Sequence, residues 1–156
     1  MTRGTRSAQI SMALKVELKP GERVLIGECV VTNHDHQRTR LLIQGQAPIL
    51  REKDILTPEQ ANSPAKRIYL AIQLMYTSGN PRAQHEIYFS LVRDILTAAP
   101  SMWPYIEAIN NHILTAEMYK ALKAAKKLID YEQELLDHAK RRASLRESGE
   151  GDRQSA

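Results

Sequence analysis

The spacing of apolar residues changes once along this chain, near residue 57. Before that point apolar side chains recur at every second residue, as where Leu14, Val16 and Leu18 alternate with charged residues, a pattern typical of a strand with one buried face. After it they recur at every third or fourth residue, which is the period of a helix. Strands followed by helices, without alternation of the two, predict an α+β fold.

The first third of the chain is expected to form a small antiparallel sheet of about five short strands. Pro20-Gly21, Gly27 and two polar segments interrupt its apolar runs, and residues of these types favour turns. A sheet this small buries little core by itself, so we expect it to pack on the helices or to form a homodimer. The predicted strands cover residues 14–18, 23–26, 29–32, 39–44 and 49–51.

Three helices are expected in the rest of the chain. Ser63, Asn80 and Ser101 are of the types that cap helix N-termini, and prolines at 64 and 81 suit a first helical position. The predicted helices cover residues 64–76, 81–97 and 102 to beyond 141.

Composition adds domain boundaries at both ends. Residues 1–12 and 144–156 are polar and lack periodicity, so we expect a flexible extension and a disordered tail. Between them the predicted domains are a β subdomain at 13–56 and a helical subdomain at 57–143.

Several classes of protein are disfavoured by composition. Cys29 is the single cysteine and no signal peptide opens the sequence, so we expect a cytoplasmic protein without a disulfide. Apolar stretches are interrupted by charge well before the roughly 18 residues of a membrane span. The net charge of +4, from 22 basic and 18 acidic residues, permits contact with phosphates without requiring it.

No set of residues with catalytic spacing emerges. His34, Asp35 and His36 are the one cluster of potential metal ligands, but a matching distant Cys or His is missing, and a solvated turn is the expected structure. Cys29 falls within a predicted strand, where we expect a small buried hydrophobic residue. We therefore expect neither an enzyme nor a cofactor, and a nuclease is disfavoured because no carboxylate cluster is available for metals.

Basic residues gather in the predicted sheet and could follow phosphates or stack on unpaired bases. Six acidic residues share the same stretch, which has no aromatic residue, so a solvated surface stays open as an alternative. A later lysine series interleaved with Glu132, Glu134 and Asp137 is interpreted as a solvated helical face. The RNA-binding hypothesis rests on Lys15, Lys19, Arg23, Arg38, Arg40, Arg51 and Lys53.

The runs MALKVELKPGER at 12–23, QRTRL at 37–41, APILREKDILTP at 47–58 and AKRIY at 65–69 resemble the FlbT family of alphaproteobacterial flagellar regulators. This resemblance implies binding to the 5′ untranslated region of a flagellin messenger RNA, usually to repress it and in some members to activate it. It also implies a functional partnership with FlaF, a small helical flagellar regulator.

A second resemblance concerns the strands alone. GERVLIG at 21–27 and LREKDI at 50–55 are similar to the opening and closing motifs of CsrA, whose interwoven dimers of five short strands bind messenger leaders. The resemblance implies RNA contacts at Lys19 and Arg51, although Leu18 stands where a second basic residue is usual.

One alternative is a protein-interaction module that acts through a partner such as FlaF. Aromatic residues of the helices would then anchor the partner, whereas core packing is their other role. The candidate anchors are Tyr69, Tyr76, Tyr88, Trp103 and Tyr105.

Overall fold

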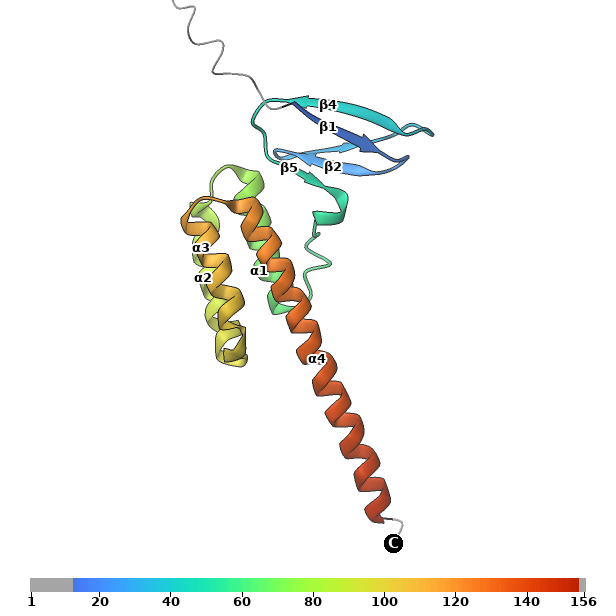
Figure 1. Cartoon of the computed structure of the whole chain (residues 1–156), viewed down its shortest axis with the longest axis vertical. Coiled ribbons are helices and arrows are strands. Elements are labelled where there is room, and N and C mark those ends of the chain that lie inside the picture. Colours follow the sequence, from blue (N-terminus) through green and yellow to red (C-terminus); the bar gives the residue numbers. More distant parts are fainter. Residues whose placement is uncertain (1–12, 155–156) are drawn as a thin grey trace, which may run out of the picture. The chain divides into compact units, whose positions relative to one another are not determined.

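The computed structural model describes residues 13–154, with side chains to residue 149, and divides them into two compact units (Figure 1). The first unit contains the described residues up to Ile55 together with a later segment, Tyr76–Asn80. The second unit contains Leu56–Met75 and the chain from Pro81 onward. The predicted flexible extension at 1–12 lies outside the described residues.

Five strands build the first unit, at the positions that the alternation predicts. They pair within one chain as two antiparallel sheets, β1–β4 and β3–β2–β5, where a single sheet was expected. The α+β class is confirmed. The strands are β1 (Ala13–Leu18), β2 (Arg23–Ile26), β3 (Cys29–Thr32), β4 (Thr39–Gln44) and β5 (Ile49–Arg51).

The core of the first unit contains apolar side chains from both sheets. Val16 and Leu18 of β1 and Val24 of β2 are at most 3% exposed. Partly buried residues of the other strands pack against them, such as Leu41 and Val31, which stand opposite Val16 and Val24 in the strand register. The apolar faces of the two sheets therefore supply one shared core.

A type II turn carries the chain from β1 in one sheet to β2 in the other. Glu22 N–H donates to the Lys19 carbonyl at 3.0 Å, and Pro20 and Gly21 occupy the central positions. The second central position of this turn needs a positive φ, and Gly21 has φ 77°.

Asn33 holds the β3–β4 loop to the end of β1. Its amide nitrogen donates to the carbonyls of Leu18 at 3.0 Å and Gln37 at 2.9 Å. Its side-chain oxygen accepts from Asp35 N–H at 3.0 Å and from the Thr39 hydroxyl at 3.2 Å. Asn33 is only 7% exposed, so this side chain is a buried structural hub.

The helices number four in the described residues, and the prediction of three is wrong. They are α1 (Pro64–Ser78), α2 (Arg82–Ala98), α3 (Trp103–Leu114) and α4 (Met118–Gln154), with short 3₁₀ helices η2 (Glu52–Asp54) and η3 (Pro100–Met102). No helix among these residues combines the length and apolarity that crossing a membrane requires.

The long third helix of the prediction is interrupted at 115–117. Ala116 has φ 58°, a left-handed conformation that ends α3, and the Thr115 hydroxyl bonds back to the carbonyls of Asn111 and His112. After the break α4 continues to Gln154, whereas the sequence predicted a disordered tail from residue 144.

The second unit buries apolar stripes from all four helices. Ile68 and Ile72 of α1, Ile106 and Ile109 of α3 and Leu128 of α4 are fully buried. Tyr69 and Tyr88 are also core residues, so these two candidate anchors are unavailable to a partner. The hydroxyl of Tyr88 donates to Asn110 of α3 at 2.5 Å, which ties α2 to α3.

The start of α1 is capped twice. The Ser63 hydroxyl accepts from Lys66 N–H at 3.3 Å, as predicted, and the Glu132 carboxylate of α4 accepts from Ala65 N–H at 2.9 Å. Glu132 is 6% exposed, so its interpretation as part of a solvated face is wrong. Asn80 does not cap its helix, and Ser101 instead accepts from the Tyr131 hydroxyl at 2.8 Å.

Candidate nucleic-acid interface

All seven basic residues of the RNA-binding hypothesis lie in the first unit and are exposed to solvent. The structure divides them into two groups with different surroundings. The first group lies on β1, β4 and the segments that adjoin them, and contains Lys15, Lys19, Arg38 and Arg40. The second group lies on β2, β5 and η2, and contains Arg23, Arg51 and Lys53.

The first group follows the face of β1–β4 that points away from the core. Val16 and Leu41 face the core, so their neighbours on each strand face outward. Lys15 stands opposite Leu42, and Arg40 is diagonal to Lys15, a placement that brings Cβ atoms within about 7–8 Å. Leu42 is 57% exposed and adds an apolar contact to this face.

Lys19 and Arg38 belong to the same group and lie just beyond the paired residues of β1 and β4. They adjoin Leu18 and Thr39, the last register pair of the two strands. Arg38 lies 3.7 Å from the Glu17 carboxylate, which stands opposite Arg40. We call Lys15, Glu17, Lys19, Arg38 and Arg40 the β1–β4 outer face; among these described residues, four cations surround one carboxylate.

The second group is closer to neutral. Arg23 Nε lies 3.2 Å from the Glu52 carboxylate, and η2 places Glu52 and Asp54 on either side of Lys53. Arg51 stands opposite Val24, near the first residue of β2. The turn that begins at Lys19 leads into this same end of β2. Lys19 and Arg51, the two positions implied by the resemblance to CsrA, therefore lie at the same end of β2.

Two further predictions concern metal binding and nucleophilic chemistry. Cys29 is exposed next to the β2–β3 hairpin turn, so the expectation that it is buried is wrong. His34, Asp35 and His36 form an exposed turn, as predicted, and Asp35 N–H is held by Asn33. In the described part of the chain, no three or more His, Cys, Asp or Glu side chains could hold a metal ion together.

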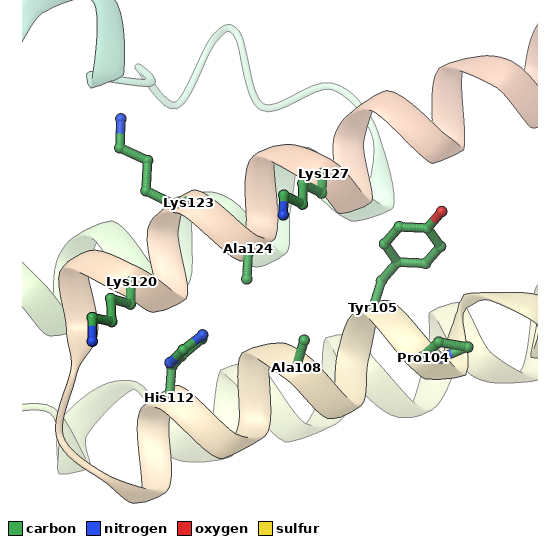
Figure 2. A pocket seen from close by; sticks show the side chains of 8 residues that line it. All are labelled: Pro104, Tyr105, Ala108, His112, Lys120, Lys123, Ala124 and Lys127. Atoms are coloured by element: carbon green, nitrogen blue, oxygen red, sulfur yellow. The ribbon is translucent and has the colours of Figure 1, made fainter.

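A groove between α3 and α4 was missed by sequence reasoning (Figure 2). The lysine series interpreted as a solvated face supplies one wall of this groove, which has a volume of about 350 Å³. The sequence carried no signal for this groove, because its two walls were predicted to lie on one continuous helix. The lining residues are Pro104, Tyr105, Ala108 and His112 of α3 and Lys120, Lys123, Ala124 and Lys127 of α4.

Comparison with known proteins covers both units. The sequence profile of the family described as flagellar protein FlbT matches residues 14–136, which cover β1 from its second residue, the other four strands and most of the helical region. No solved structure matches the chain.

Curated relatives carry the same family name. A probable flagellum biosynthesis repressor protein FlbT 1 of Bradyrhizobium diazoefficiens is 66% identical over 80% of this chain and 85% of its own length. The Rhodopseudomonas palustris relative is 52% identical over 80% of this chain and 98% of its own length. The flagellum biosynthesis repressor protein FlbT of Caulobacter vibrioides is 38% identical, over 81% and 92% respectively. This chain belongs to the FlbT family of flagellar proteins.

Proposed function

We propose that this protein regulates flagellum biosynthesis after transcription, by binding the 5′ untranslated region of flagellin messenger RNA. Binding represses translation or promotes degradation of the message. The names of the relatives support the flagellar and repressive parts of the proposal. The β1–β4 outer face is the observation that supports RNA as the ligand.

The chemistry of this face suits single-stranded RNA. Lysine and arginine side chains neutralise phosphates, and the guanidinium planes of Arg38 and Arg40 are surfaces on which splayed bases stack. Leu42 lies among them and can contact a base edge. In the described part of the chain no third strand pairs with β1 or β4, and the proposal assigns contacts with bases to backbone groups at these strand edges.

Repression follows from occupancy of the leader. A protein bound across a messenger leader excludes the ribosome from the same nucleotides. In this proposal, degradation of the message is carried out by a cellular ribonuclease.

The test is a fluorescence anisotropy titration of the full chain against the flagellin leader and an unrelated RNA, at two salt concentrations. Each lost phosphate contact should make the negative slope of log K against log salt shallower by about 0.7. The variant Lys15→Ala/Arg40→Ala should therefore bind the leader more weakly and with a shallower slope. Arg93→Ala is the control, because it also removes one positive charge from an exposed residue, but on α2. It should leave the slope unchanged. Equal affinity of the intact protein for both RNAs would refute specific recognition.

The positions implied by CsrA need separate variants. Lys19→Ala belongs to the outer face and should weaken binding as Lys15→Ala does. Arg51→Ala lies in the more neutral group beside Glu52 and should weaken binding less. A larger loss at Arg51 than at Lys19 would move the RNA site to the β2–β5 side of the unit.

A second candidate function, interaction through a FlaF-like partner, is favoured by exposed apolar side chains of the helical unit. Ile87 and Phe89 of α2 are 53% and 51% exposed, and Trp103 of α3 is 49% exposed. Side chains of this size at a surface are typical of protein interfaces. If the leader binds only after the FlaF-like protein is added, the indirect mechanism replaces direct recognition.

A further inference from the structure

The groove between α3 and α4 has two walls that face each other with the same spacing. Figure 2 shows Tyr105, Ala108 and His112 projecting from α3 toward α4, with Lys120 and Lys127 above them. The small side chains at its centre leave it open, and its volume of about 350 Å³ falls within the range of small-ligand sites.

The charge of this groove is positive. Three lysines, Lys120, Lys123 and Lys127, line it, and none of the described lining residues is a carboxylate. Glu117, outside the lining, lies 2.5 Å from Lys120 and offsets one charge. Hydrogen bonds from Lys120 and then from the Thr115 hydroxyl hold the pKa of Glu117 below its usual value.

The positive charge is extended along α4. Lys120 and Lys127 are seven residues apart in sequence, which corresponds to about 10 Å along a helix. Lys123, between them, extends away from α3 in Figure 2 and lies 5.1 Å from the centre of the Tyr119 ring. An anion that meets Lys120 and Lys127 together must carry charge over a comparable length, as a chain of phosphates does.

The other end of the groove is aromatic. Tyr105 stacks on Tyr131 with ring centres 4.7 Å apart, and the Tyr131 hydroxyl donates to Ser101 at 2.8 Å. These contacts fix the Tyr105 ring at the end of the groove where Lys127 lies, and Pro104 precedes Tyr105 in the lining. An aromatic ring next to an elongated cationic surface is the combination by which proteins bind nucleotides without reading their sequence.

We propose that this groove binds nucleotide phosphates, with the base against Tyr105 and the phosphates along Lys127, Lys120 and His112. The nucleotide comes either from a free nucleoside polyphosphate or from a strand of RNA. This inference is independent of the function proposed for the β1–β4 outer face, because it concerns the other unit and its own residues.

The test uses the full chain with three probes: adenosine triphosphate, single-stranded hexauridylate and inorganic pyrophosphate. Isothermal titration calorimetry measures affinity, and the fluorescence of Trp103, the single tryptophan, reports binding two residues from Tyr105. We expect adenosine triphosphate, hexauridylate or both to bind with a change in this fluorescence. Pyrophosphate should bind more weakly because it lacks a base.

Variants locate the site. Lys120→Gln and Lys127→Gln should each weaken binding about threefold to fivefold. Lys140→Gln makes the same change on exposed α4 outside the groove and should have no effect. Tyr105→Leu should weaken the nucleotide probes and leave pyrophosphate unchanged.

The outcomes distinguish a free nucleotide from an RNA strand as the ligand, and they distinguish this inference from the function proposed for the β1–β4 outer face. Binding of adenosine triphosphate alone identifies a free nucleotide as the ligand, and binding of hexauridylate alone, sensitive to Lys127→Gln, identifies an RNA strand. Absence of binding by all three probes, or equal losses in Lys127→Gln and Lys140→Gln, overturns the inference even if the leader binds the β1–β4 outer face. Binding of adenosine triphosphate at the groove supports it even if the leader does not bind.

Discussion

Replacement of Asn33 tests how the strands of the first unit are held in place. The four hydrogen bonds of this side chain join the end of β1 to the β3–β4 loop. A buried hydrogen bond contributes about 1 kcal/mol net, and less where water can replace it. Only the bond to the Leu18 carbonyl is fully buried, so Asn33→Ala should lower the free energy of unfolding by about 2 to 3 kcal/mol.

An isosteric variant makes the same prediction sharper. Asn33→Asp keeps an acceptor for Asp35 N–H and the Thr39 hydroxyl, but it places a carboxylate oxygen against the carbonyls of Leu18 and Gln37. The two carbonyl oxygens would repel the carboxylate, because neither side has a hydrogen to donate. Asn33→Asp should therefore be at least as destabilising as Asn33→Ala, although aspartate has nearly the same shape as asparagine.

The assay is urea denaturation combined with amide hydrogen exchange of the β1 and β4 backbone, because exchange reports the first unit separately. Gln37→Ala is the control, since Gln37 contributes only its carbonyl to this hub and its side chain is exposed. Gln37→Ala should change stability by less than about 0.5 kcal/mol. If Asn33→Asp is as stable as the parent protein, the hydrogen-bonding role of Asn33 is wrong.

Three further predictions concern the helical unit. Glu132→Ala should lower the free energy of unfolding by about 1 to 3 kcal/mol in urea denaturation, because Ala65 N–H loses a buried acceptor, whereas Glu132→Gln should cost less. Ala116→Gly should raise the melting temperature, since glycine removes the strain of φ 58° for a net gain of about 0.5 to 1 kcal/mol. Burial raises the pKa of Tyr88, so its contribution to stability is complete below the usual tyrosine pKa of about 10 and declines above it. Denaturation at alkaline pH should therefore show a shallower loss of stability in Tyr88→Phe than in the parent protein.

Strand positions were predictable because each strand carries its own signals. The alternation around Val16 marks the buried face of β1, and Pro20-Gly21 marks its end. Alternation identifies a buried face but not the strand that pairs beside it. The division into two sheets depends on pairings between distant segments, such as Ile26 with Ile49, and these leave no mark in local sequence.

The interruption between α3 and α4 was not predictable from glycine or proline, because neither occurs there. Ala116 adopts a conformation that alanine disfavours, and the neighbouring Thr115 provides the local hydrogen bonds that compete with the helix. The turn folds α4 back along α3, and only this contact places Lys127 beside Tyr105. The groove could therefore not be found before the helical break was known.

The candidate site was partly visible from the sequence. All seven basic residues are exposed, but the sequence alone did not separate Lys15 and Arg40, on an outward face, from Arg23, which is paired with Glu52. That separation depends on strand register and on an ion pair between residues 29 positions apart.

Photo-cross-linking of the full chain to a flagellin leader containing 4-thiouridine would test most directly where RNA binds. Peptide mapping by mass spectrometry then identifies the residues in contact with the bases. The proposal predicts cross-links in 13–19 and 38–44, the segments that contain the β1–β4 outer face. Cross-links confined to the helical unit, or none beyond those of an unrelated RNA, would contradict recognition of the leader by that face.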